Sequence, residues 1–215
     1  TDTRVPNIDT SNLVSGKAAT EEQTTATYKH RKDPVVVTTG NKVTYNLTVY
    51  NEGEKEGRAT KIVDQLPTGL IYNSGSTVTS KDGTGATKNT YNVTYESTTN
   101  KITFDITGTP EDLQPYETGN LDSETIEIQC KVVAQADTTN NKILTNVAWI
   151  SGAYDTVDQT EATDRDSQTT SSPNVDKDNN IEDYTGNTNN KTDLTDNTYY
   201  YEGEQDDEDN EKLVI

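Results

Sequence analysis

The sequence predicts an all-β protein built around an antiparallel sandwich. Thr, Tyr and Val are frequent in the first 150 residues, and these β-branched and aromatic residues favour strands. Apolar and polar residues alternate in several short runs, which indicates strands with one buried face. Gly, Pro and Asn turns separate the runs, and no segment has the 3.6-residue apolar period of an amphipathic helix. Short strands at this spacing are typical of a sandwich.

The two clearest predicted strands are residues 43–50 and 124–134. In the first, alternate residues from Val43 to Val49 are apolar, and in the second the alternation runs from Ile126 to Val132. Residues 91–95 and 101–106 read as a hairpin. The remaining predicted strands are residues 26–30, 34–37, 59–66, 70–72 and 143–150.

The pattern divides the chain into four regions. Residues 1–26 are a polar, extended lead-in segment, residues 27–157 the sandwich, residues 158–211 an acidic loop rich in Asn, Asp and Thr, and residues 212–215 a final strand. Composition alone would make the acidic region disordered. The apolar run Tyr199 to Tyr201 and the strand-like end Lys212 to Ile215 instead favour an ordered acidic loop that wraps on the sandwich.

The charge of the chain excludes some partners. The formal net charge is −19, and residues 155–212 carry 18 acidic against four basic residues. Such a field repels nucleic acid and anionic membranes but suits cations. No apolar run approaches the roughly 20 residues that a membrane-spanning helix needs. We therefore expect neither nucleic-acid binding nor membrane insertion.

Catalytic motifs are also lacking, so we predict that the chain is not an enzyme. His30 is the single histidine and lies in a basic patch, so no Ser-His-Asp set can form elsewhere. Cys130 is the single cysteine and lies in a strand-like run, where a buried structural thiol is expected. The sequence has no Gly-rich phosphate loop and no His/Cys metal cluster, and nothing singles out one glycosidase-like pair of carboxylates.

Five short motifs occur in a fixed order along most of the chain. They are VTYNLTVYNEG at 43–53, IVDQLPTGL at 62–70, TNVAWI at 145–150, DRDS with a later PN at 164–174, and DDEDNEKLVI at 206–215. In this order they resemble the conserved-repeat (DUF11) domains of cell-surface proteins in Gram-positive bacteria (Firmicutes). The resemblance implies an immunoglobulin-like sandwich, exposed on the cell surface or cell wall as part of a stalk, fimbria or adhesin.

The resemblance also implies an autocatalytic Lys–Asn isopeptide bond, with Asn146 as the amide and Asp64 as the assisting acid. The chemistry needs a neutral amine and a protonated carboxyl, and burial favours both forms. Asp64 follows an apolar pair at the end of a strand, where Asp has poor β propensity. The simpler alternatives are a turn cap for Asp64 and an edge hydrogen bond for Asn146.

The lysine of this bond is not identified by the sequence, because related domains carry it on a first strand that has no counterpart here. Three sources are open: a strand that precedes Thr1 in a longer chain, an internal lysine such as Lys29, or a strand donated by a neighbouring subunit. A sandwich that lacks an edge strand is expected to pair with another chain.

Calcium is a second candidate for the acidic region. Closely spaced oxygen ligands are offered by Asp164, Asp166, Asp176, Asp178 and Asn180. No run matches an EF-hand, and the alternative is a solvated acidic loop that keeps the protein soluble.

These observations favour a structural subunit or stalk repeat of a bacterial surface fibre, with neighbouring copies of the same protein as partners. The alternative is an adhesin, or a ligand- or carbohydrate-binding module, that contacts a host or surface ligand. Trp149 is expected in the core rather than on a sugar-binding platform, because it lies within a strand. Tyr199, Tyr200 and Tyr201 are then the only candidates for such a platform.

Overall fold

The structure is a computed structural model that describes residues 4–16, 26–29, 34–133, 143–162 and 208–215. In these residues all regular secondary structure is strand. No helix in this part of the chain is long and apolar enough to span a membrane. The strands are β1 (Asn7–Asp9), β2 (Thr27–Lys29), β3 (Val35–Val36), β4 (Lys42–Tyr50), β5 (Gly57–Gln65), β6 (Leu70–Tyr72), β7 (Thr77–Asp82), β8 (Thr87–Glu96), β9 (Lys101–Thr107), β10 (Ser123–Val132), β11 (Ile143–Asp155), β12 (Thr160–Glu161) and β13 (Glu208–Val214).

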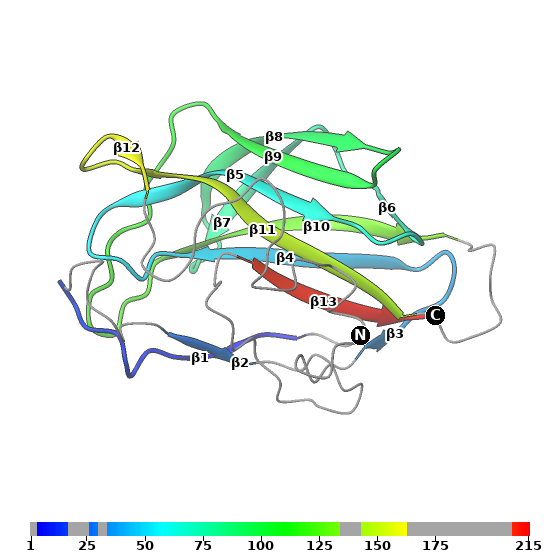
Figure 1. Ribbon diagram of the computed structural model, residues 1–215, viewed down its shortest axis with the longest axis horizontal. Coiled ribbons are helices and arrows are strands. Elements are labelled where there is room, and N and C mark those ends of the chain that lie inside the picture. The colour runs from blue at the N-terminus through cyan, green and yellow to red at the C-terminus, as the bar shows by residue number, and fades with distance from the viewer. Residues whose placement is uncertain (1–3, 17–25, 30–33, 134–142, 163–207) are drawn as a thin grey trace, which may run out of the picture.

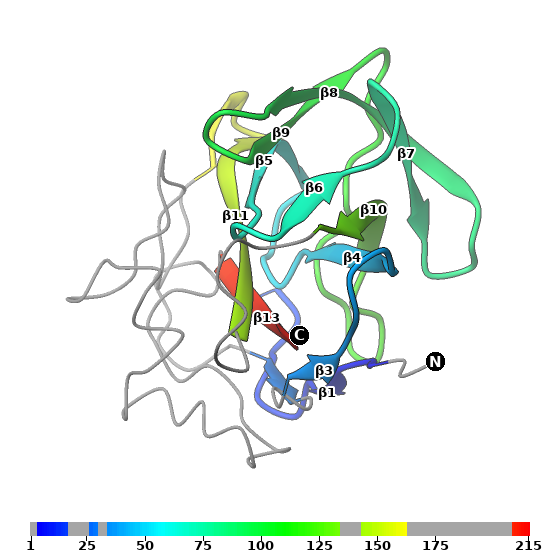
Figure 2. The ribbon, with the colours of Figure 1, turned by 90° about the vertical axis from the view of Figure 1, so that its right-hand side faces the viewer.

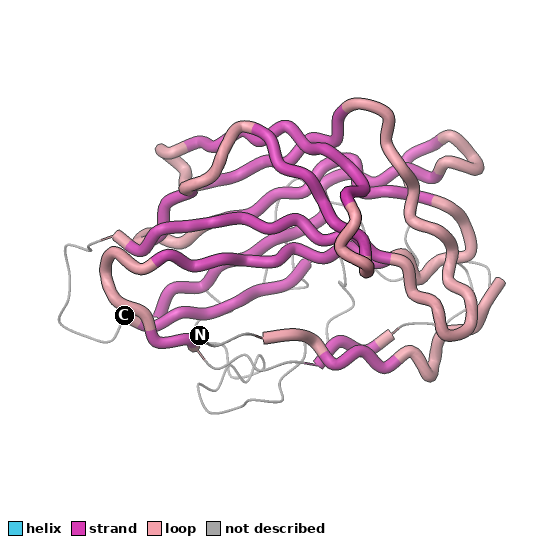
Figure 3. The backbone as a smooth tube through the Cα atoms, turned by 180° about the vertical axis from the view of Figure 1, so that it is seen from behind, coloured by secondary structure: helices cyan, strands magenta, loops and turns pink. Residues whose placement is uncertain are grey.

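Eleven of the strands form one continuous sheet that curls on itself (Figure 1). Its order is β3-β13-β11-β5-β9-β8-β7-β10-β4, with β12 beside β11 and β6 beside β10. Every pair is antiparallel except β13 with β3. In Figure 2 the sheet is seen from one end, with β4 and β10 on the opposite side of the core from β5 and β11. Figure 3 shows the long strands running side by side from behind.

One hydrophobic core fills the space inside the curled sheet. Ile62 of β5 and Leu144 of β11 belong to the same buried cluster as Tyr45 of β4 and Ile128 of β10. The strict alternation of β10, buried at every second residue up to Val132, follows because one face packs on the core and the other faces solvent. The all-β fold predicted from the sequence is confirmed, and the two walls of the predicted sandwich belong to one curled sheet.

The wall formed by β5 and β11 is buried on both of its faces. Val63, Val147 and Trp149 make a second cluster on the face away from the main core. Trp149 is only 3% exposed, as its position within a strand predicts. A wall buried on both faces explains the nearly continuous apolar run of residues 143–150, in place of a clean alternation.

Two elements near the ends of the described chain complete the fold. β1, which lies in the predicted lead-in segment, pairs with β2 as a small separate sheet. Glu52 holds this hairpin against the sandwich, since it accepts hydrogen bonds from the backbone of Ala26 and the hydroxyl of Tyr28. At the other end, the returning strand begins at Glu208 rather than at Lys212, and it pairs with β11 over seven residues.

Candidate functional site

Asp64 and Asn146 lie on neighbouring strands and meet inside the core. Asp64 on β5 is directly opposite Ala148 on β11, and Asn146 lies two residues from Ala148. Because side chains two apart on a strand share a face, Asn146 points to the same side as Asp64. Its Nδ2 donates a hydrogen bond of 2.8 Å to Asp64 Oδ2. The structure thus brings together the two residues that the sequence resemblance pairs.

Burial changes the acidity of Asp64. The side chain is fully buried, and desolvation raises the pKa of its carboxyl from 3.8 to about 7, although the hydrogen bond from Asn146 lowers it in part. A carboxyl with this pKa holds its proton in a large fraction of molecules near neutral pH. Asp64 is therefore a potential proton donor rather than a fixed negative charge.

Three buried oxygen atoms on this side of the core have no hydrogen-bond partner among the described residues. They are Oδ1 of Asp64, Oδ1 of Asn146 and the hydroxyl of Tyr45. Buried polar atoms are almost always hydrogen-bonded in folded proteins. A group of three unsatisfied oxygens therefore indicates a missing donor group rather than three separate defects.

The charge of Asp64 acts on two nearby core residues, Tyr45 and Cys130. Desolvation and then the charge of Asp64 raise the pKa of the Tyr45 hydroxyl, with smaller contributions from Cys130 and Glu211. The same two causes raise the pKa of the Cys130 thiol to about 12. Cys130 is thus a buried, protonated thiol, as expected from the sequence. Glu211 joins the site because it is directly opposite Asn146 in the pairing of β13 with β11.

Lys212 does not supply the missing donor from inside the described chain. It is buried, but it lies directly opposite Thr145 in the β13–β11 pairing, and Thr145 is next to Asn146 along β11. Adjacent residues of a strand point to opposite faces. Lys212 therefore points to the face of Trp149, away from Asp64. The side chain of Lys29, an alternative from the sequence, lies outside the described residues.

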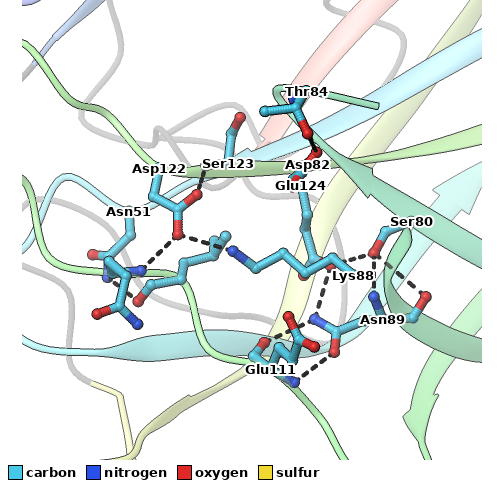
Figure 4. Close-up of polar contacts among 12 residues, drawn as sticks. Asn51, Ser80, Asp82, Thr84, Lys88, Asn89, Glu111, Asp122, Ser123 and Glu124 are labelled. Carbon is cyan, nitrogen blue, oxygen red and sulfur yellow. Dashed lines mark hydrogen bonds and ion pairs between the residues drawn. The ribbon is translucent and has the colours of Figure 1, made fainter. Parts of the chain in front are cut away.

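A second buried carboxyl group was missed by the sequence analysis. Glu124 of β10 is fully buried and accepts hydrogen bonds from three side chains: Ser80 Oγ at 2.5 Å, Asn89 Nδ2 at 2.9 Å and Tyr91 Oη at 2.7 Å. Figure 4 shows Ser80 and Asn89 pointing toward it. The available signal was its position, since Glu124 has the same parity along β10 as the inward-facing Ile126 and Ile128.

The loop between β9 and β10 is attached beside Glu124. The amide of Asn89 donates to the backbone oxygen of Glu111 and accepts from its backbone nitrogen. Lys88 forms an ion pair with Asp122 at 2.9 Å, as Figure 4 also shows. The side chains of Ser80, Asn89 and Glu124 are all hydrogen-bonded, so the cluster is a structural element that fixes the loop to β8.

The predicted calcium ligands Asp164, Asp166, Asp176, Asp178 and Asn180 lie outside the described residues, as do His30 and Tyr199 to Tyr201. Within the part of the chain that the structure describes, no group of three or more His, Cys, Asp or Glu side chains could hold a metal ion.

Among known proteins, this chain is similar to several solved structures. No family model and no curated protein matches the sequence. The major pilin subunit BcpA of Bacillus cereus is 13% identical, with a TM-score of 0.37 over 74% of this chain. The pilus 2b backbone protein of group B streptococcus is 22% identical, with a TM-score of 0.32 over 65% of this chain. The collagen adhesin of S. aureus is 13% identical, with a TM-score of 0.33 over 66% of this chain. This chain covers 37%, 56% and 51% of those three chains.

Proposed function

We propose that this chain is a structural module of a bacterial surface fibre, and that a lysine from an added strand forms an amide cross-link with Asn146. The observation that carries the proposal is the buried Asp64–Asn146 pair, with its unsatisfied oxygens. The sequence motifs that resemble Gram-positive surface repeats support the cellular setting.

A primary amine is the group that best fits the three oxygens. A lysine side chain ends in up to three N–H donors and, when charged, has no acceptor. Asp64 Oδ1, Asn146 Oδ1 and the Tyr45 hydroxyl can all accept. A charged lysine could therefore satisfy three buried atoms whose desolvation otherwise costs roughly 1–3 kcal/mol each, and the neutral amine that reacts still has two donors.

The cross-link follows from the same geometry. The neutral amine adds to Cγ of Asn146, and the bond from Cγ to Nδ2 then breaks. Asp64 lies beside Nδ2 and is positioned to give it a proton, so that it leaves as ammonia. The amine loses the corresponding proton to Asp64, which ends as it began. The product is one Lys–Asn amide and one free ammonia.

Two edges of the curled sheet are open to an added strand in the described structure. β4 pairs only with β10, and residues 208–212 of β13 pair only with β11. Unpaired backbone groups at an edge are a template for another strand. We propose that the strand which brings the lysine pairs with one of these edges, and that it is donated by a neighbouring subunit of the fibre.

The test is the intact mass of the full-length protein, measured under denaturing and reducing conditions. A ladder of covalent multimers that disappears in Asn146→Ala supports a lysine donated by a neighbouring subunit. A monomer short by one ammonia supports the cross-link but places the lysine in the same chain, which overturns donation. If the sample contained nothing but monomer of the unmodified mass, the cross-link would be ruled out.

Among the described residues, a sugar-binding platform receives less support than the cross-link. The chain has a single tryptophan, and Trp149 is buried in the second cluster. Tyr72 and Tyr95 form a tilted aromatic pair at 5.6 Å, but both hydroxyls bond to the protein itself, at Gly75 and Asn100.

A further inference from the structure

The hydroxyl of Tyr45 is an expensive group at its position. Tyr45 is 7% exposed and belongs to the main hydrophobic cluster, yet its oxygen has no hydrogen-bond partner among the described residues. Phenylalanine would fill the same space without burying an unsatisfied hydroxyl. A polar atom that weakens the folded state often has a functional reason.

The cross-linking reaction creates a need for such a group. When an amine adds to Cγ of Asn146, negative charge develops on Oδ1, and enzymes stabilise such an oxyanion with a fixed donor. Asp64 does not fill this role, because its hydrogen bond is with Nδ2 at the other end of the amide. Oδ1 of Asn146 has no donor within the described residues.

Tyr45 lies across the core from Asn146, where burial and then the nearby charge of Asp64 raise the pKa of its hydroxyl. It is a core residue of β4, opposite Ile128 of β10, and Asn146 is a buried residue of β11. Figure 2 shows β4 and β11 on different sides of the curled sheet. Glu211 flanks the site from β13 as the residue opposite Asn146. Among the unsatisfied buried atoms on this side of the core, the Tyr45 hydroxyl is the one that always carries a hydrogen to donate.

We propose that Tyr45 donates a hydrogen bond to Oδ1 of Asn146 as the amine adds, and so acts as the oxyanion-binding group of the cross-linking site. This inference rests on the cross-linking function proposed above. The hydroxyl keeps its proton throughout: it stabilises the negative oxygen while Asp64 transfers the proton to the leaving nitrogen. When ammonia leaves, the carbonyl reforms and Tyr45 bonds to the new amide.

The core contains a matched control for this residue. Tyr91 is also a buried tyrosine of the main cluster, but its hydroxyl donates to Glu124 at 2.7 Å. Tyr91→Phe removes the same atom from the same core without touching the Asp64–Asn146 pair. A general effect of losing a buried hydroxyl would therefore slow both variants alike.

The experiment follows cross-linking of the full-length protein in a cell-free translation mixture, stopped by denaturation at timed intervals. Intact mass gives the fraction of chains that have lost ammonia. We expect Tyr45→Phe to react about a hundredfold more slowly than the parent, the usual effect of removing one oxyanion donor. Tyr91→Phe should react within a few-fold of the parent. Because Tyr45 stays neutral, the pH at which the rate is half-maximal should not move in Tyr45→Phe.

Each other outcome overturns a defined statement. Loss of ammonia at equal rates in the parent and Tyr45→Phe would refute the role of Tyr45 and leave the cross-link intact. Equal slowing of Tyr45→Phe and Tyr91→Phe would reduce Tyr45 to a packing residue. A parent protein that never loses ammonia would refute the proposed cross-link and the role of Tyr45 with it.

Discussion

Asp64 and Glu124 are both fully buried carboxyl groups, but their surroundings are opposite. Glu124 accepts from Ser80, Asn89 and Tyr91, whereas Asp64 accepts from Asn146 alone and leaves one oxygen unsatisfied. A saturated carboxyl group is an anchor, since each donor that it binds would otherwise be buried without a partner. An unsaturated one is available to a further group. The difference separates a structural site from a candidate reactive site within one core.

The largest contrast is expected in the dependence of stability on pH. The pKa of Asp64 is about 7 in the folded chain against 3.8 as its ordinary value, so the folded state retains a proton that the unfolded state releases. Stability contributed by Asp64 is thus complete below about pH 4 and is lost as the pH rises toward 7, by roughly 4 kcal/mol. Urea unfolding across this range, compared with Asp64→Asn, isolates the effect.

The comparison with Asp64→Asn is needed because other carboxyls titrate in the opposite sense. Hydrogen bonds from Gln114 and Ser123 and the Lys88 ammonium hold the pKa of Asp122 below its usual range, despite desolvation that acts the other way. If the parent and Asp64→Asn show the same pH dependence, Asp64 is not protonated in the folded chain, and its role as proton donor is wrong.

The next effect concerns the anchor. Glu124→Ala leaves three donors without their acceptor inside the core, and we expect a loss of about 3 kcal/mol or more in the free energy of unfolding. Glu127→Ala is the matched control, because Glu127 lies on the same strand but faces solvent. Its change should stay within about 0.5 kcal/mol. Equal effects in urea unfolding of the two variants would show that the Glu124 cluster is not an anchor.

The burial of both carboxyl groups could be predicted from the sequence, because each acid lies at an even spacing from inward-facing apolar residues of its strand. Asp64 falls on the inward positions of its strand with Ile62 and Leu66, as Glu124 does with Ile126 and Ile128. An acidic residue that shares the inward-facing positions of a strand with apolar residues is expected to be buried. It does not predict the donors, because these come from other strands: Asn146 is 82 residues from Asp64, and Ser80 is 44 residues from Glu124.

Other features could not be read from local pattern. Strand β7 was not predicted because its one fully buried residue, Ser80, is small and polar; in the fold it donates a hydrogen bond to Glu124. Strand β1 escaped prediction because three residues are too few to show a period. Tyr45 was correctly placed on an inward face, but an unsatisfied hydroxyl is a property of the folded core that no strand pattern reports.

The two buried tyrosines give a smaller test of the same contrast. Tyr91→Phe removes one donor from Glu124, and we expect it to lower the free energy of unfolding by about 1–3 kcal/mol. The measurement is urea unfolding at constant pH. No change would mean that Ser80 and Asn89 alone satisfy the carboxyl group.

Tyr45→Phe should have the smallest effect and the opposite sign. It removes a buried hydroxyl that has no partner among the described residues, so the chain should gain up to about 1 kcal/mol in the free energy of unfolding. The prediction holds for chains that have not cross-linked, which Asn146→Ala provides as a background for both tyrosine variants. A loss of stability in Tyr45→Phe would mean that the hydroxyl already has a partner in the folded chain. A gain, together with slower cross-linking, would show that the fold gives up stability at Tyr45 to serve the reaction.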